Sequence, residues 1–314
     1  MVEVFLGGPS KDKIRRELDI PLIKEVSQDG KERLSYFGLA GPLLLDIIEW
    51  QDYLKEFVVV EESYIGAKER SVERNRQELL LKTSFITQLQ DGRGVINDFL
   101  TVLYGDIDKD IILKVKGDFG KKLPKQSFEL IYLDYYGGIF KAKNREDAIK
   151  TLISNQKQNS EADYKYVLLI TVENLDKGEA EKRILIDEIL KNLEDAKVDS
   201  DSLHKFKGYI SGCRYGLLQK IYVPLQIYLY TRYVGDEIEY FEPVIYQEKK
   251  ESTKTAEMLH FRFIISIQKN TKTASQMIKD IVNICNLKLL TVEEDRITNY
   301  KEQCPELYLE RGGK

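Results

Sequence analysis

Short apolar runs alternate with helix-like segments along most of the chain. Apolar runs rich in β-branched and aromatic residues lie at residues 34–39, 57–60, 111–116, 128–133 and 166–172. Segments of helical character lie between or beside them, at residues 43–54, 66–88, 95–103, 144–156 and 179–193. Strands that are apolar throughout are buried on both faces, and their alternation with helices is typical of parallel sheets. The pattern predicts an α/β fold with a doubly wound, mostly parallel sheet.

The two ends of the chain depart from this alternation. Residues 238–247 and 258–268 alternate apolar and polar positions around a short polar link, which predicts an antiparallel C-terminal hairpin. The aromatic-rich residues 220–234 are predicted as a helix despite Pro224, residues 197–205 as a polar connection, and residues 274–284 as a further helix. A charged helix is expected at residues 10–18. We therefore expect an N-terminal appendage at 1–30, the α/β domain at 31–270 and a C-terminal helical extension at 271–314.

Composition is that of a soluble globular protein. The 314 residues are 42% hydrophobic and 32% charged, which is too apolar for intrinsic disorder. No run approaches the roughly 18 apolar residues of a membrane helix, and the N-terminus lacks a secretory pattern. We expect a cytoplasmic protein without a membrane partner. Three separated cysteines and two histidines, His204 and His260, have no metal-ligand or nucleophile-elbow spacing, so we expect no metal site.

The most informative segment is the apolar run 128–133, because it ends in Asp134, Tyr135 and Tyr136 followed by two glycines. Ligands of open parallel sheets bind outside the carboxyl ends of the strands. Asp134 is therefore the first candidate for an acceptor site, with Tyr135 or Tyr136 stacking on a substrate ring. The alternative is that Asp134 caps the turn through backbone amides while both tyrosines pack in the core.

A second candidate site follows the first strand. Residues 34–39 run through Gly38 into Ala40-Gly41-Pro42 and then into a helix, which is the strand, glycine turn and helix order of nucleotide-binding units. The second strand ends in Glu61 and Glu62, with Glu61 twenty residues after Gly41. A carboxylate at this place can accept hydrogen bonds from both hydroxyls of a ribose.

These motifs, in this order, resemble class I S-adenosylmethionine-dependent methyltransferases of the nucleic-acid-modifying type. The stretch 35–42 is similar to a Phe-Ala-Gly-Pro-Gly first motif, and Asp134-Tyr135-Tyr136-Gly137 is similar to an Asp-Pro-Pro-Tyr fourth motif. The resemblance spans about residues 30–270. It implies S-adenosylmethionine as cofactor. The implied cofactor contacts are Gly38, Gly41, Pro42, Glu61 or Glu62, Asp118 and Phe119, with Asp118 near the adenine amino group at the end of the predicted third strand.

The motifs are degenerate compared with the family pattern. Leu43 stands where the first motif ends in glycine, and Tyr135 replaces a proline of the fourth motif. The function expected from the resemblance is methyl transfer to a nucleic-acid base. The alternative is a catalytically inactive protein of the same fold that acts as an interaction or scaffold subunit. A nicotinamide-dependent oxidoreductase would require a G-x-G-x-x-G turn, which the chain lacks.

Expected partners follow from charge. The net charge of −4 argues against a surface that is basic throughout, but basic residues flank the strand before Asp134 and recur on the helix predicted at 66–88. These residues are Lys114, Lys116, Lys121, Lys122, Lys125, Arg70, Arg74 and Arg76. They predict either a local groove for DNA or RNA or simply solvated faces. The tyrosines between 222 and 233 leave a protein partner or homo-oligomer open as well.

Overall fold

The computed structural model describes residues 9–39, 45–61, 100–104, 106–112, 127–135, 144–159, 164–174, 179–213, 215–234, 236–249, 255–267, 274–293, 296–301, 303 and 307. The strands are β1 (Leu34–Gly38), β2 (Leu54–Glu61), β3 (Leu100–Tyr104), β4 (Leu130–Asp134), β5 (Lys165–Glu173), β6 (Glu237–Tyr240), β7 (Val244–Lys249), β8 (Thr255–Ser266), β9 (Leu290–Glu293) and β10 (Arg296–Asn299). The helices are α1 (Pro9–Ile14), α2 (Ile20–Val26), α3 (Leu45–Trp50), α5 (Arg145–Asn159), α6 (Glu179–Asp195), α7 (Ser200–Gly212), α8 (Tyr215–Val234) and α9 (Ala274–Cys285). Shorter helical turns are η1 (Arg15–Asp19), η2 (Gln51–Tyr53) and η3 (Ile107–Ile112).

One mixed sheet forms the middle of the molecule. Its strand order is β10-β9-β7-β8-β5-β4-β1-β2-β3, with β6 paired to β8 beside β7. Strands β1 to β5 are mutually parallel, and β8 is antiparallel to β5 and to β7. The predicted doubly wound sheet with an antiparallel C-terminal hairpin is confirmed. The run predicted as one strand at 238–247 is divided into β6 and β7, which both pair with β8.

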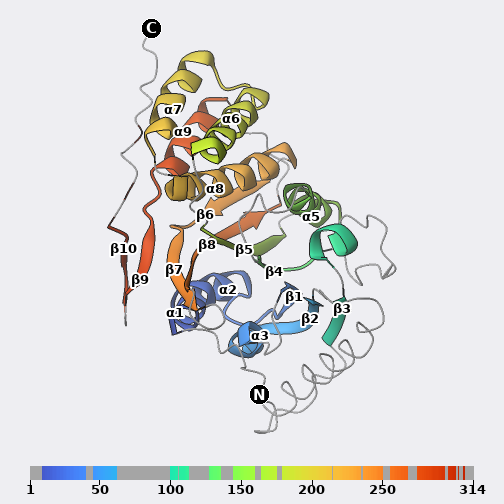
Figure 1. Cartoon of the computed structure of the whole chain (residues 1–314). Helices are drawn as coiled ribbons and strands as arrows, with labels where there is room; N and C mark the ends of the chain where they lie inside the picture. Colours follow the sequence, from blue (N-terminus) through green and yellow to red (C-terminus); the bar gives the residue numbers. More distant parts are fainter. Residues whose placement is uncertain are drawn as a thin grey trace, which may run out of the picture.

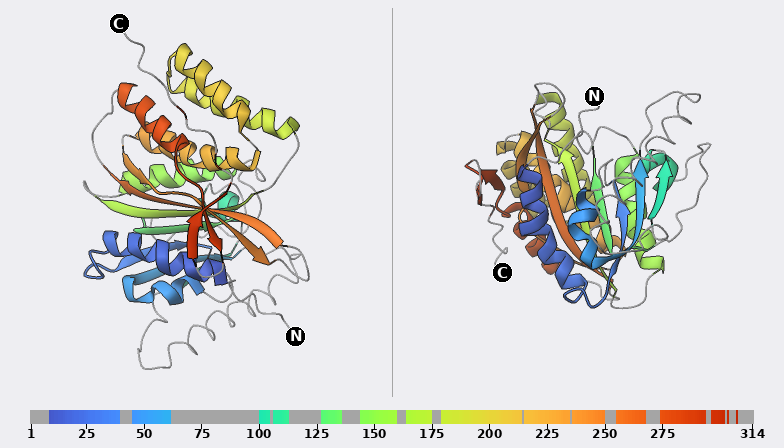
Figure 2. Two further views of the ribbon diagram at one scale, coloured as in Figure 1. Left: turned by 90° about the vertical axis from the view of Figure 1, so that its left-hand side faces the viewer. Right: turned by 90° about the horizontal axis from the view of Figure 1, so that it is seen from below.

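Helices cover both faces of the sheet (Figures 1 and 2). The blue helices α1, α2 and α3 lie on one face, and α5 to α9 lie on the other, as the edge-on view in Figure 2 shows. Alternation along β4 serves both layers: Leu130 and Tyr132 pack with Trp50 and the N-terminal helices, whereas Ile131 and Leu133 pack in the core under α5 and α8. Successive side chains of a strand point to opposite faces, so one apolar strand supplies two cores.

The third strand lies earlier than the sequence predicts. Residues 100–104 form β3, although this segment was expected to be helical, and residues 107–112 form the turn η3 instead of beginning a strand. In β3 a β-branched and aromatic run pairs with β2, from Leu100 opposite Phe57 to Tyr104 opposite Glu61. Short apolar runs do not distinguish a strand from a buried helix, and here pairing with β2 decides. β3 ends at Tyr104, and the first acids after it in the sequence are Asp106 and Asp108.

The ends of the chain are also more integrated than predicted. The N-terminal helical segment extends to Val26 and packs on the sheet, where Ile14 joins an apolar cluster with Tyr246 and Met258. The predicted helix α9 is confirmed, but the tail after it adds β9 and β10 to the sheet. The division at residues 30 and 270 stays a prediction. Within the part of the chain that the structure describes, no helix is both long and apolar enough to cross a membrane.

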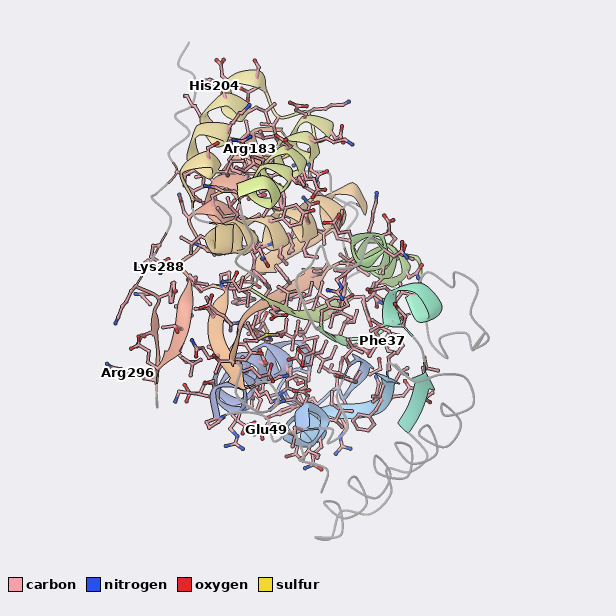
Figure 3. The ribbon with its side chains drawn as sticks, viewed as in Figure 1. Phe37, Glu49, Arg183, His204, Lys288 and Arg296 are labelled. Carbon is pink, nitrogen blue, oxygen red and sulfur yellow. The ribbon has the colours of Figure 1, made fainter. Side chains whose placement is uncertain are left out.

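An N-terminal cap explains helix α7, which the sequence pattern did not predict. Residues 197–205 were expected to be a polar connection, yet α7 begins at Ser200. The Asp199 carboxylate accepts a hydrogen bond from Ser202 N at 2.9 Å, which satisfies a free amide of the first turn. His204 lies exposed on this helix and is labelled at the top of Figure 3.

Candidate functional site

The carboxyl ends of the central strands bring three predicted site residues to one edge. Gly38 ends β1 and pairs with Tyr132 of β4 and with Val59 of β2. Asp134 is the last residue of β4, two positions beyond Tyr132, and Glu61 is the last residue of β2. Leu39 N donates to the Tyr132 carbonyl at 3.1 Å, so the pairing of β1 and β4 continues past Gly38. Both candidate sites therefore lie at the same edge of the sheet.

Gly38 stands where backbone segments approach too closely for a side chain. A Cβ atom added there would lie 2.1 Å from the Tyr132 carbonyl oxygen and 2.9 Å from the Tyr36 hydroxyl. The ordinary contact range for a Cβ begins at 3.4 Å. Only glycine fits this position without displacing β4, because the space that a side chain would occupy is filled by the backbone of Tyr132.

Asp134 faces the N-terminal helices and is paired there. Lys11 Nζ donates a hydrogen bond to Asp134 Oδ2 and lies 4.0 Å from Glu248 Oε1 of β7. Burial, the largest single effect, lowers the pKa of Lys11, but the combined attraction of Asp134, Asp46 and the neighbouring tyrosines outweighs it and the pKa lies well above its usual value. The Lys11 side chain is therefore protonated and places a positive charge at the carboxyl end of β4. Burial also raises the pKa of Glu248, against the attraction of Lys11.

Beyond Lys11, two more side chains of the N-terminal helices make buried polar contacts. Arg15 Nε donates to Asp46 of α3, and both side chains are almost fully buried. Burial raises the pKa of Asp46, and the Arg15 charge opposes that shift. One turn further on, Asp19 Oδ1 lies 2.9 Å from His260 Nε2, and His260 Nδ1 lies 2.9 Å from Thr171 Oγ1. At the outer rim, Arg16 pairs with Glu49, which Figure 3 labels on α3.

Tyr135 points to the opposite face of the sheet from Asp134. Its hydroxyl donates to Asp108 Oδ1 at 2.8 Å, and the Arg145 guanidinium lies 4.0 Å above its ring. Arg145 Nε also lies 3.5 Å from Asp108 Oδ2. Burial raises the pKa of Asp108, while the hydrogen bond from Tyr135 opposes the shift. Tyr135 is buried in this cluster, which favours the core role that the sequence left open for it.

Part of the predicted site lies outside the described residues. The residues concerned are Gly41, Pro42, Glu62, Asp118, Phe119 and Tyr136, together with all eight lysines and arginines of the predicted basic groove. For Glu61 the structure gives the backbone position at the end of β2. The roles assigned to these residues stay predictions.

Sequence reasoning missed Lys11, Arg15 and Asp19. Their spacing of four residues places them on one side of a helix, interleaved with Ile14, Leu18 and Leu22, which is a signal that the sequence does contain. A charged stripe inside an apolar stripe indicates polar groups that are buried against partners. It was overlooked because the segment was interpreted as an appendage.

Comparison with known proteins gives structural similarity only. No family model matches the sequence, and no curated protein does. Solved structures similar to this chain include a precorrin-6Y C5,15-methyltransferase from Geobacter metallireducens, with TM-score 0.31, 9% identity, and coverage of 74% of this chain and 81% of that one. Another is TYW2 from P. horikoshii in complex with MeSAdo, with TM-score 0.37, 9% identity, and coverage of 85% and 67%.

A third is an O-methyltransferase family protein from Burkholderia thailandensis, with TM-score 0.33 and 9% identity, where the match covers 83% of this chain and 59% of that one. At these scores and identities the comparisons add nothing about chemistry. The fold assignment rests on the strand order and register of the sheet.

Proposed function

We propose that this chain is an S-adenosylmethionine-dependent methyltransferase that transfers a methyl group to an amino nitrogen of a nucleic-acid base. The observation that carries the proposal is the placement of Gly38 and Asp134 at the carboxyl ends of the adjacent parallel strands β1 and β4. In an open parallel sheet, this edge is where a cofactor and a substrate can be held side by side. Alignment of donor and acceptor accounts for most of the rate in such a transfer.

The residues at this edge fit the cofactor. Gly38 lets β1 run close beside β4, since a Cβ there would meet the Tyr132 carbonyl oxygen, and this pairing brings the ends of both strands to one edge. Glu61 ends the neighbouring strand and is the proposed partner of the ribose hydroxyls. The bound cofactor would supply an activated methyl group on a sulfonium. Gly41, Pro42, Glu62, Asp118 and Phe119 are proposed to complete the site.

Asp134 is proposed to hold the acceptor. Its carboxylate can accept hydrogen bonds from an amino group and so orient the nitrogen toward the methyl donor. The Tyr135 hydroxyl is hydrogen-bonded to Asp108, and Arg145 covers its ring. Tyr136 is therefore the residue that we propose to stack on the base. The basic residues at 114–125 are proposed to contact nucleic-acid phosphates.

Labelled methyl transfer tests this function. Purified protein is incubated with S-adenosylmethionine carrying a tritiated methyl group and, separately, with total RNA or genomic DNA as acceptor. We expect label to enter one nucleic acid, and Asp134→Asn to reduce transfer at least about a hundred-fold, as expected for loss of a positioned acceptor contact. Binding of S-adenosylhomocysteine should change by less than about threefold, because Asp134 holds the acceptor and not the cofactor.

The control is Asp187→Asn, which changes an exposed carboxylate on α6 and should leave transfer unchanged. Transfer that survives Asp134→Asn would contradict the role of Asp134. Loss of cofactor binding in that variant would place Asp134 in the cofactor pocket. If the wild-type chain binds no cofactor, the alternative of a non-catalytic interaction subunit takes the place of this proposal.

A further inference from the structure

The Lys11 ammonium lies between two carboxylates that belong to different strands. It donates to Asp134 at the end of β4 and lies 4.0 Å from Glu248 on β7. The Lys11 side chain is only 11% exposed, whereas Asp134 and Glu248 are 21% and 28% exposed. The two acids therefore remain partly open to solvent, while the cation fills the space between them.

Aromatic groups complete the surroundings of this ammonium. Lys11 Nζ lies 6.0 Å from the centroid of the Tyr132 ring, at the outer limit of a cation–π contact. Tyr246 stands two residues before Glu248 on the same side of β7, and its hydroxyl is buried with no hydrogen-bond partner among the described residues. The Tyr36 hydroxyl, beside Gly38, is buried and without a partner in the same sense. Buried hydroxyls that lack a partner are costly, and these two offer hydrogen-bonding capacity that a polar ligand could use.

The neighbouring ion pair of Arg15 and Asp46 differs from that of Lys11 in how far it is buried. Arg15 and Asp46 are both almost fully buried, and each satisfies the other inside the fold. Lys11 lies on α1, a helix of six residues at the beginning of the described chain. Its ammonium has three donors; two carboxylates and the Tyr132 ring lie around it, and the Tyr246 phenol is near enough to interact with its charge. This set of groups is suited to any primary ammonium, and its carboxylates can also accept hydrogen bonds from a neutral amino group.

We propose that Asp134, Glu248 and Tyr246 form a binding site for the amino group of the acceptor, and that Lys11 is an internal ligand of this site. In this arrangement α1 closes the acceptor edge, and Lys11 has to withdraw before a substrate amino group can reach Asp134. The proposal rests on the proposed methyltransferase function for the identity of the ligand. The existence of an ammonium site can be tested without the cofactor.

Chemical rescue tests the site directly. Lys11→Ala removes a propylammonium group from the space between the acids, and n-propylammonium chloride is the matching probe. We expect the probe to raise the melting temperature of Lys11→Ala by about 2 °C or more at saturating concentration, as a ligand that binds only the folded state does. Wild-type protein and Lys13→Ala should respond only as they do to sodium chloride, since Lys13 pairs with Glu17 on the same helical segment.

Three results would overturn the proposal. Equal rescue by uncharged 1-propanol would mean that the space accepts any apolar chain. Rescue that persists in the double variant Lys11→Ala with Asp134→Asn would mean that the acids do not hold the ammonium. Absence of any rescue contradicts the site altogether.

Lysine reactivity provides a test that does not depend on folding of Lys11→Ala. In wild-type protein, Lys11 should react with acetic anhydride at least about tenfold more slowly than Lys13, as measured by mass spectrometry. Asp134→Asn and Glu248→Gln should each raise the rate at Lys11 and leave Lys13 unchanged. Equal rates at the two lysines in wild-type protein would contradict an internal ligand. Neither test involves S-adenosylmethionine, so failure of the proposed methyl transfer would be seen separately.

Discussion

Replacing Gly38 by alanine tests the close approach of β1 and β4. The added methyl group would lie 2.1 Å from the Tyr132 carbonyl oxygen, and relief to an ordinary contact of 3.4 Å requires the two backbones to separate. The obstacle is main chain, which has no rotamer to change. Separation also weakens the hydrogen bond from Leu39 N to the Tyr132 carbonyl, which is 3.1 Å long.

The cost follows from these two effects. Overpacking in a closely packed region costs about 1–3 kcal/mol, and loss of one backbone hydrogen bond costs about 0.5–1.5 kcal/mol. We therefore expect Gly38→Ala to lower the free energy of unfolding by about 2–4 kcal/mol. With a urea m-value of about 3 kcal/mol per molar, the upper end of the range for small proteins, the midpoint of unfolding should fall by about 0.7–1.3 M.

Gly208→Ala is the matched control. Gly208 lies exposed in α7 with no atom within 4 Å of the added methyl group. Alanine is favoured over glycine in a helix by about 0.5–1 kcal/mol, so this variant should be slightly more stable than wild type. The two substitutions are chemically identical and should shift the urea midpoint in opposite directions. A Gly38→Ala midpoint equal to or above that of wild type would refute the proposed packing of β1 against β4.

Three further predictions concern the buried polar groups. Asp46→Ala leaves Arg15 buried without its main partner and should lower the free energy of unfolding by about 3–5 kcal/mol in urea titrations; a loss below about 1 kcal/mol would contradict the burial of the pair. His260→Ala should cost about 2–5 kcal/mol, because both Asp19 and Thr171 lose a partner, and near-neutral behaviour would argue against that chain of contacts. Burial raises the pKa of several tyrosines, so the folded state keeps phenol protons that the unfolded state loses above pH about 10, and stability should fall as pH rises beyond that value. Tyrosinate absorbance should then appear together with loss of circular dichroism, and gradual titration before unfolding would contradict the burial of Tyr36, Tyr132, Tyr135 and Tyr166.

Much of the fold could be predicted because several strands carry their own signal. The apolar runs that became β1, β2, β4 and β5 are continuous and bounded by polar turns, so local pattern and tertiary structure agree. The same signal placed Asp134 and Gly38 at strand ends. The third strand was misplaced because Leu100–Tyr104 and residues 111–116 have similar apolar character, and only pairing with β2 distinguishes them.

The partners of the site residues could not be predicted from local pattern. Lys11 and Asp134 are separated by 123 positions, and Asp19 and His260 by 241. Such contacts depend on how the N-terminal helices lie across the sheet, which no local period encodes. The direction of the Tyr135 side chain is different, because strand alternation already places it opposite Asp134 once β4 is accepted as a strand.

Calorimetric titration of S-adenosylhomocysteine into the purified chain shows whether the edge formed by β1 and β4 holds a methyl donor. We expect saturable binding of one ligand per chain, weaker in Gly38→Ala and unchanged in Gly208→Ala. Absence of saturable heat at millimolar ligand, with the protein folded, would contradict this expectation.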